Sequence, residues 1–255
     1  MAKKPNLNQT VSYLDDFLKI AEVEDSSYNG LQVEGKDEIK KIAFAVDAGV
    51  EVFEKAKREN ADLLVVHHGL FWEKTDPRFI GVNKKRLEIL LDAGINLYAA
   101  HLPLDMHKEV GNNVELVKIA GASVCGGFYK YHGSFIGALG KFSAQKKVSQ
   151  VAEILENKLK TKTYIIGESR EVFTVAAVSG GVGADTVTCA KEAGADLLIV
   201  GEKRDFYHLS NDLGISVIFA GHHASEQTGI WALQKHIQEK FPEIECVYIE
   251  CPTGL

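Results

Sequence analysis

Features that mark several classes of protein are scarce in this chain of 255 residues. It has four cysteines, Cys125, Cys189, Cys246 and Cys251, and no two of them form a C-x-x-C pair. A disulfide scaffold is therefore excluded, and a reducing compartment fits best. No apolar run approaches the roughly 18 residues that a membrane span needs. The N-terminal segment MAKKPNLNQT also lacks the apolar stretch of a secretory signal. We therefore expect a cytoplasmic protein.

The sequence also lacks an excess of positive charge. The chain has 29 lysine and arginine residues against 35 aspartate and glutamate residues, and its formal net charge is −6. This overall charge gives no support to nonspecific nucleic-acid binding, although a local basic patch stays open. The sequence also lacks the P-loop, dinucleotide-binding and G-x-S-x-G motifs, so no substrate can be inferred from a motif of these kinds. With 45% hydrophobic and 25% charged residues, the composition is typical of a folded globular protein.

The sequence contains an internal repeat. Lys41–His68 aligns without a gap with Val175–Glu202, and the run ADLLVV falls on ADLLIV. Asp92–His101 resembles Asp212–His222 if one inserted residue is allowed, and both segments hold a D-x-G-I turn. Short apolar runs separated by amphipathic helices are typical of buried parallel strands joined by crossover helices. The predicted fold class is therefore α/β, with two duplicated β-α-β-α-β halves.

The repeat also predicts how the chain is divided. Residues 1–124 and 171–255 are expected to form the duplicated core. Residues 125–170 interrupt the repeat and are predicted to be a small inserted α+β module with a structural or assembly role. The hydrophobic period predicts a helix near Val11–Val23 and a last helix near Ser225–Lys240.

Histidines follow the predicted strands. Directly after apolar runs stand His67, His68, His101, His222 and His223. A carboxylate follows at the same H-x-x-x-D/E spacing in each half, as Asp105 and Glu226. The carboxyl ends of parallel strands lie at one edge of a sheet, where α/β proteins bind ligands. The pattern therefore predicts that these side chains form one cluster.

The residue types in this cluster indicate a metal site. Imidazoles and carboxylates are good ligands for divalent transition ions. Crowding so many titratable groups together without a cation would cost desolvation and repulsion. The donors outnumber what one four-coordinate ion needs, which favours two ions that share a bridging carboxylate. The set contains no thiolate, which argues against a structural zinc site.

Two further positions have a functional and a structural interpretation. Glu202 takes in the second half the place of His68 in the first, and it is the predicted catalytic residue, as a general base. Support of a metal ligand and a solvated turn are the alternatives for Glu202. Asn83–Arg86 begins a helix with three cations and could hold a phosphate, while a solvated basic face is the alternative.

Four motifs, YNGLQVEG, HHGLFW, HLPLD and GHHASEQTG, closely resemble the GTP cyclohydrolase I type 2 homologue family, whose members are also described as Nif-like dinuclear-metal-centre hexameric proteins. The resemblance covers nearly the whole chain. It implies that one divalent ion is bound by His67 and His222, that the other is bound by His68 and Asp105, that Glu226 bridges them and that His101 is an additional ligand. It also implies a duplicated α/β fold around a central metal site and a homohexamer. The sequence does not distinguish zinc, manganese, iron, cobalt and nickel.

The leading functional hypothesis is a metal-dependent hydrolase that acts on a nucleotide or another phosphorylated small molecule, with GTP as the substrate that the family name suggests. One alternative is a non-enzymatic metal-binding or regulatory protein that works through partner contacts. Another is a ring-shaped hexamer that binds nucleic acid, against which the charge of −6 counts. No membrane partner is expected. A turnover screen of the metal-loaded protein would separate these hypotheses.

Overall fold

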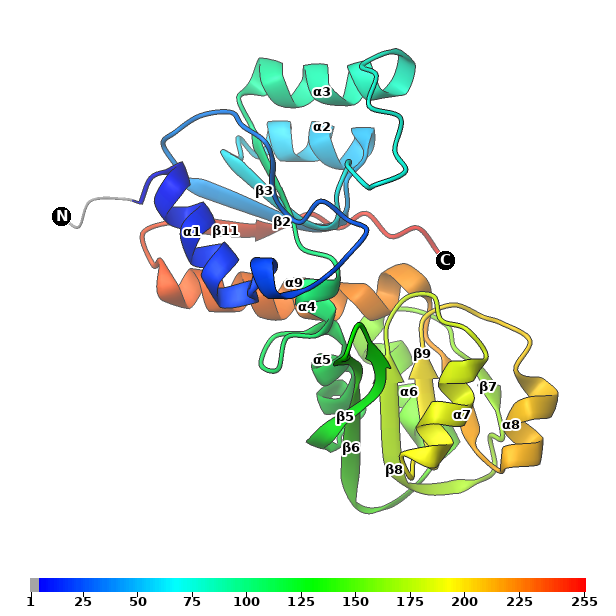
Figure 1. The fold of residues 1–255 in the computed structure, drawn as a ribbon. Helices are drawn as coiled ribbons and strands as arrows, with labels where there is room; N and C mark the ends of the chain where they lie inside the picture. Colours follow the sequence, from blue (N-terminus) through cyan, green and yellow to red (C-terminus); the bar gives the residue numbers. More distant parts are fainter. Residues whose placement is uncertain (1–4) are drawn as a thin grey trace. The chain divides into compact units, whose positions relative to one another are not determined.

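The computed structural model describes residues 5–255, which form two compact units with one β-sheet each. Unit 1 comprises residues 5–104 and 230–251, and unit 2 comprises residues 105–229 and 252–255. Two helices contain a boundary between the units, α4 (Leu102–Asp105) and α9 (His222–Lys240). Figure 1 shows the elements of each unit along the chain.

Unit 1 has a five-stranded sheet with the order β1-β4-β3-β2-β11. Its strands are β1 (Gly30–Val33), β2 (Lys41–Asp47), β3 (Leu63–His68), β4 (Asn96–Ala99) and β11 (Glu245–Tyr248). Its other helical segments are α1 (Leu7–Leu18), the 3₁₀ turn η1 (Ile20–Glu22), α2 (Val50–Arg58) and α3 (Gly81–Ala93). Strand β1 is antiparallel to β4, and the other neighbours are parallel. Helices α2 and α3 cover one face of the sheet, and α1 and the unit 1 part of α9 cover the other (Figure 1).

Helix α1 begins and ends earlier than the predicted helix near Val11–Val23. The Asn6 side chain accepts a hydrogen bond from the Gln9 backbone N–H at 3.0 Å, and the Gln9 side chain accepts one from Asn6 at 3.1 Å. This reciprocal pair is a capping box, which fixes the first turn of a helix. Lys19, with φ of 56°, ends the helix in the left-handed conformation. The capping residues Asn6 and Gln9 therefore set the start of α1, ahead of the apolar residues from which the helix was predicted.

Unit 2 has a six-stranded sheet with the order β5-β6-β8-β9-β10-β7. Its strands are β5 (Ser123–Tyr131), β6 (Ser134–Lys147), β7 (Tyr164–Ile166), β8 (Glu171–Val178), β9 (Leu197–Val200) and β10 (Ser216–Phe219). Its helices are α5 (Asn112–Ile119), α6 (Val148–Leu159), α7 (Asp185–Glu192) and α8 (Tyr207–Leu213). Residues 125–170, the predicted inserted module, supply most of β5 together with β6, α6 and β7, so they share a sheet with β8, β9 and β10. An assembly role for this stretch stays a prediction.

The duplication is visible in the strand order of the two sheets. The parallel strands β2, β3 and β4 of unit 1 correspond to β8, β9 and β10 of unit 2. In each unit an antiparallel strand flanks the last of the three, β1 beside β4 and β7 beside β10. Gly94 and Gly214 end the preceding helices with φ of 65° and 66°, a left-handed conformation that glycine adopts without steric cost. The predicted α/β class is confirmed, and the repeated D-x-G-I turn is a helix C-cap.

The ungapped alignment of the two halves is wrong by one residue at the first strand. Ile42 pairs with Leu63 in unit 1, and Val175 pairs with Leu197 in unit 2. Val175 therefore corresponds to Ile42, whereas the alignment placed it on Lys41. These strands are apolar throughout because both faces of the sheet are buried, so no alternation of polar residues fixes their register.

The central strands of both sheets form the cores. Residues Leu63–Val66 of β3 and Leu197–Val200 of β9 are fully buried. On one face of each sheet they pack against the paired helices, α2 and α3 in unit 1 and α7 and α8 in unit 2. Within residues 5–255 no helix combines the length and the apolar character that crossing a membrane requires.

Candidate metal centre

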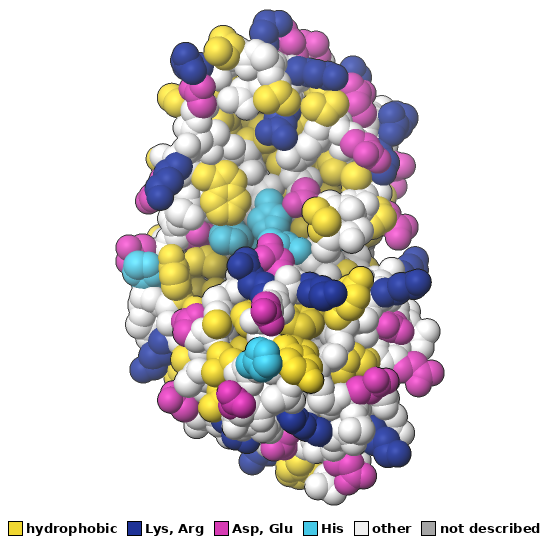
Figure 2. All heavy atoms as spheres, turned by 90° about the vertical axis from the view of Figure 1, so that its right-hand side faces the viewer, with side chains coloured by type: hydrophobic (Ala, Val, Ile, Leu, Met, Phe, Trp, Pro, Cys, Tyr) yellow, Lys and Arg dark blue, Asp and Glu magenta, His cyan; other side chains and the backbone are white. Residues whose placement is uncertain are grey.

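Three of the predicted metal ligands lie together in unit 1. His67 and His68 end β3, and His101 directly follows the neighbouring parallel strand β4. One ligand atom from each of the three lies within 4.8 Å of the others. His67 is fully buried, whereas the side chains of His68 and His101 are each 21% exposed. Figure 2 shows histidine side chains among carboxylates at the surface of the molecule. The strand-end arrangement expected from the sequence therefore holds for these three residues.

Each of these imidazoles is oriented by a hydrogen bond at Nδ1. The acceptors are the Ala100 carbonyl for His67 at 2.9 Å, Asp47 Oδ1 for His68 at 2.8 Å and Asp25 Oδ2 for His101 at 3.0 Å. A carbonyl or carboxylate oxygen can only accept, so each Nδ1 carries a hydrogen, and when the ring is neutral its lone pair lies on Nε2. Histidines that bind metal ions are oriented in this way by a carbonyl or carboxylate. The residues of unit 1 therefore fit a divalent cation in both donor type and tautomer.

Asp25 holds this cluster to the loop before β1. Its side chain is 2% exposed and accepts hydrogen bonds from His101 Nδ1, Leu102 N, Ser27 N and Asn29 Nδ2. Burial opposes ionisation of this carboxyl, but the hydrogen bonds and the charge of the His101 ring outweigh it and hold the pKa of Asp25 at about 2. Asn29 Oδ1 also accepts from the His101 backbone N–H at 2.7 Å. This loop therefore fixes both the main chain and the ring of His101.

In unit 2, His222 lies between two carboxylates. It is the first residue of α9, which begins three residues before the predicted helix near Ser225–Lys240. Its Nε2 lies 3.1 Å from Glu226 Oε2, one helical turn further on, and its Nδ1 lies 2.9 Å from Glu202 Oε1. The hydrogen bond with Glu226 is the largest cause that raises the pKa of His222 to about 9, with Glu202 adding to it and burial opposing it. Two further predicted ligands, His222 and Glu226, are thus in contact.

The backbone after β8 approaches both carboxylates closely. A Cβ added to Gly180, whose φ is 66°, would lie 2.3 Å from Glu226 Oε1. A Cβ added to Gly181 would lie 2.8 Å from the carboxyl group of Glu202. The two glycines are needed because a side chain at either position would displace a carboxylate of the cluster. Sequence analysis missed both, although the run SGGVG after a buried strand is a recognisable signal.

Asp105 is the first residue of unit 2, whereas His101 belongs to unit 1. Its side chain is buried, and Oδ1 accepts hydrogen bonds from Asn112 Nδ2 at 2.8 Å and from Ser179 Oγ at 3.0 Å. These two hydrogen bonds fix the orientation of the carboxylate. A carboxylate oxygen is a suitable ligand for a divalent cation.

Glu202, the predicted catalytic residue, binds His222 and Arg204 through separate oxygens. Arg204 Nη2 donates to Glu202 Oε2 at 2.6 Å. The hydrogen bond from His222 is the largest cause that lowers the pKa of Glu202, followed by that from Arg204, while burial opposes both. A lowered pKa weakens a carboxylate as a proton acceptor, and the contact at His222 Nδ1 is the one that orients a metal-binding imidazole. The geometry therefore favours the orienting role of Glu202 over the role of general base.

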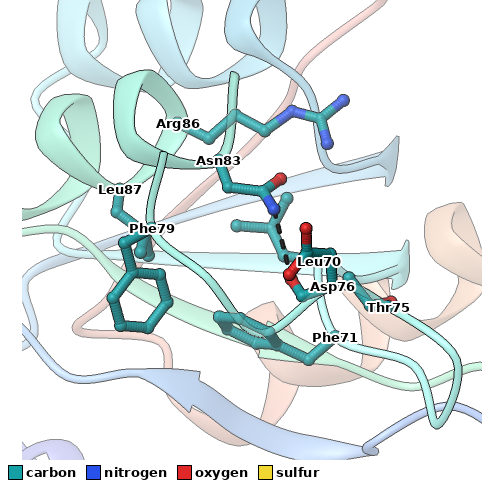
Figure 3. Close-up of a pocket in the computed structure, with 8 residues that line it drawn as sticks. All are labelled: Leu70, Phe71, Thr75, Asp76, Phe79, Asn83, Arg86 and Leu87. Carbon is teal, nitrogen blue, oxygen red and sulfur yellow. Dashed lines mark hydrogen bonds between the residues drawn. The ribbon is translucent and has the colours of Figure 1, made fainter. Parts of the chain in front are cut away.

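The basic helix start Asn83–Arg86 offers little room for a phosphate. The Asn83 amide donates to the backbone carbonyls of Asp76 and Arg78, each at 3.3 Å. Figure 3 shows Asn83 pointing to Asp76 across a pocket that is also lined by Phe71, Phe79 and Leu87. The volume of this pocket is about 10 Å³, which is room for one water molecule. The solvated basic face is therefore the better interpretation of this helix start.

Fold and site define a class: an α/β protein with a duplicated sheet unit and histidine and carboxylate clusters that could bind metal at its strand ends. The profile of the DUF34/NIF3 (NGG1p interacting factor 3) family matches residues 5–253, and the chain belongs to this family.

Relatives named GTP cyclohydrolase 1 type 2 homolog are similar over their whole length. The one from Pyrococcus horikoshii is 47% identical over 97% of this chain and 99% of its own. The one from Archaeoglobus fulgidus is 46% identical over 98% of this chain and 100% of its own. A solved structure from Thermus thermophilus is 39% identical with a TM-score of 0.86, over 98% of this chain and 100% of its own. The resemblance inferred from the four motifs is confirmed.

Proposed function

We propose that this chain is a metal-dependent hydrolase that holds two divalent ions and acts on a nucleotide or another phosphorylated small molecule. The observation that carries the proposal is the set of three strand-end histidines whose Nδ1 atoms all donate to a carbonyl or carboxylate. The names of the relatives support a nucleotide as the substrate class.

The proposed ligands are those that the family resemblance implies: His67 and His222 for one ion, His68 and Asp105 for the other, Glu226 as the bridge and His101 as an additional ligand. When bound, divalent ions would supply Lewis-acid stabilisation of the charge that develops during hydrolysis. The contribution of the protein is orientation. Asp25, Asp47 and the Ala100 carbonyl fix three imidazoles, and Glu202 fixes a fourth.

The test is a turnover screen of the full-length protein loaded in turn with zinc, manganese, iron, cobalt and nickel, against nucleoside phosphates and other phosphoesters. We expect close to two ions per chain by elemental analysis and hydrolysis that a chelator abolishes. His132→Ala, at an exposed histidine outside both clusters, is the matched control and should change neither metal content nor turnover. One ion per chain under metal excess contradicts the two-ion proposal. Metal binding without turnover of any substrate favours the metal-binding or regulatory alternative instead.

Glu202→Gln distinguishes the two roles considered for Glu202, orientation of His222 and general base, because it keeps the shape of the side chain but removes its charge. If Glu202 orients His222, metal affinity should fall by about 10- to 100-fold, and excess metal should restore turnover. If Glu202 is the general base, metal content should stay near that of the unchanged protein while turnover falls by roughly 10²-fold or more. Isothermal titration with metal and steady-state kinetics, carried out on the same preparation, distinguish the two results.

We further propose that the chain assembles as a homohexamer, as the resemblance implies, and that it is cytoplasmic. Light scattering of the purified protein at micromolar concentration tests the assembly, and a stable monomer contradicts it.

A further inference from the structure

Unit 2 contains a cavity that the candidate metal centre does not use. Its volume is about 560 Å³, which lies within the range of small-molecule sites. It is lined by β7, by Lys203, Arg204 and Asp205 of the loop after β9, by Tyr207 at the start of α8 and by Phe219 of β10. The cavity therefore opens beside the carboxyl ends of β9 and β10, where α/β sheets bind ligands.

The loop that lines this cavity differs from its counterpart in the other half of the duplication. Residues 69–80 link β3 to α3 in unit 1, whereas only residues 201–206 link β9 to α8 in unit 2. The longer loop is bonded to the segment that leads into β1: Tyr28 N donates to the Phe71 carbonyl at 3.1 Å, and Glu73 N donates to the Ser26 carbonyl at 2.9 Å. The shorter loop leaves space beside β7, the counterpart of β1. The short loop that lines the cavity is thus particular to the second half.

The walls of this cavity combine aromatic rings with cations. Tyr164 is 56% exposed and Tyr207 is 58% exposed, although large apolar rings usually lose their contact with water on folding. The Lys203 ammonium lies 3.7 Å from the centroid of the Tyr164 ring. A flat aromatic ligand can stack on such tyrosines, and an anionic group attached to it can be bound by the neighbouring cations. Asp205 adds a carboxylate that can accept from N–H groups of a base.

The cationic side of the cavity is connected to the metal-ligand cluster of the same unit. Arg204 lines the cavity and donates to Glu202 Oε2, while the other oxygen of Glu202 accepts from His222 Nδ1. One carboxylate therefore separates a cation of the cavity from a proposed metal ligand. A phosphate bound at Lys203 and Arg204 would lie on the side of the cavity that leads to His222.

We propose that this cavity is the recognition site for a nucleoside phosphate, with the base stacked on Tyr207 and the phosphate bound by Lys203 and Arg204. This inference rests on the proposed function and assigns the part of the chain that recognises the substrate. The chemical class follows from the pairing of an exposed ring with cations in a cavity of this size, because an aliphatic phosphate would leave the Tyr207 ring in water and a neutral aromatic would bring no anion to Lys203 and Arg204.

The experiment measures binding apart from turnover. The N-methylanthraniloyl derivative of GTP is titrated into full-length, metal-free protein, and unlabelled GTP, guanosine and inorganic triphosphate then compete for the site. We expect GTP to compete about 10-fold better than either fragment. Tyr207→Ala and Lys203→Ala should each weaken binding of the labelled GTP by about 10-fold. Tyr131→Ala and Lys130→Ala, on the exposed β5–β6 hairpin of the same unit, are the matched controls and should bind as the unchanged protein does.

Failure of this inference and failure of the proposed function give different results. Labelled GTP that does not bind, or that binds Tyr207→Ala and Lys203→Ala as tightly as the unchanged protein, overturns the assignment of the cavity, whatever the turnover screen shows. Binding that both variants weaken supports the assignment even if no metal form hydrolyses a substrate, in which case only the proposed function is wrong. Circular dichroism and metal content of the variants confirm that the two exposed substitutions leave the fold intact.

Discussion

Asp25→Ala is expected to destabilise the protein by about 3 kcal/mol or more, because one buried carboxylate satisfies several donors at once. Its loss leaves the backbone N–H groups of Ser27 and Leu102 and the side chain of Asn29 without the acceptor that they use now. It also releases His101 Nδ1, so metal affinity should fall by about 10- to 100-fold. Urea unfolding measures the first effect and metal titration of the folded variant measures the second.

The control for this substitution is Asp16→Ala, at an exposed carboxylate on α1, which should change the free energy of unfolding by no more than about 0.5 kcal/mol. Equal stability of the two variants would contradict the anchoring role of Asp25.

The same carboxylate should make the protein sensitive to acid. The pKa of Asp25 is about 2 in the folded protein and close to 3.9 in an unfolded chain, so the folded state prefers the ionised form. The resulting stabilisation, about 2 kcal/mol, is present above pH 4 or so and is lost as the pH falls towards 2. Asp25→Asn removes this titration. The difference in unfolding free energy between the unchanged protein and Asp25→Asn should therefore shrink over this window, and a difference that is constant with pH would contradict the assignment.

Glu226→Ala is expected to remove both metal ions, whereas Asp105→Ala should chiefly weaken one. Glu226 is 3% exposed and contacts His222 through Oε2, and its proposed place is the bridge between the ions. A bridging carboxylate supplies both ions with charge, while a terminal ligand supplies one. Elemental analysis after dialysis against limiting metal should find close to no metal in the first variant and about one ion per chain in the second.

Glu239→Ala is the matched control, because Glu239 lies on the same helix α9 with its side chain 68% exposed. It should retain the metal content of the unchanged protein. Two ions retained by Glu226→Ala would rule out the bridge, and loss of both ions from Asp105→Ala would give that role to Asp105.

Those candidate metal ligands that directly follow a parallel strand could be predicted from the sequence. Parallel strands carry the residues that follow them to one edge of a sheet, so His67, His68 and His101 could be grouped from the sequence, and the structure gathers them. The same rule could have found Asp47, the last residue of β2, which binds His68. It could not have found Asp25, because Asp25 lies in an irregular loop whose contact with His101 depends on the path of the chain and follows no period.

By itself the sequence determined the α/β class, the duplication and the residue types at the strand ends, because buried parallel strands, left-handed glycine caps and metal-binding side chains each leave a local pattern. The tertiary structure decided what depends on residues distant in the chain. It set the one-residue shift between β2 and β8, which uniformly apolar strands cannot encode. It placed Glu202 on His222 Nδ1, a contact between a loop and a helix start that no spacing predicts. It also decided that a cavity lies beside β7, whereas the longer loop after β3 is hydrogen-bonded to the segment before β1. The length of a loop can be read from the sequence, but the space that the loop occupies is set by packing.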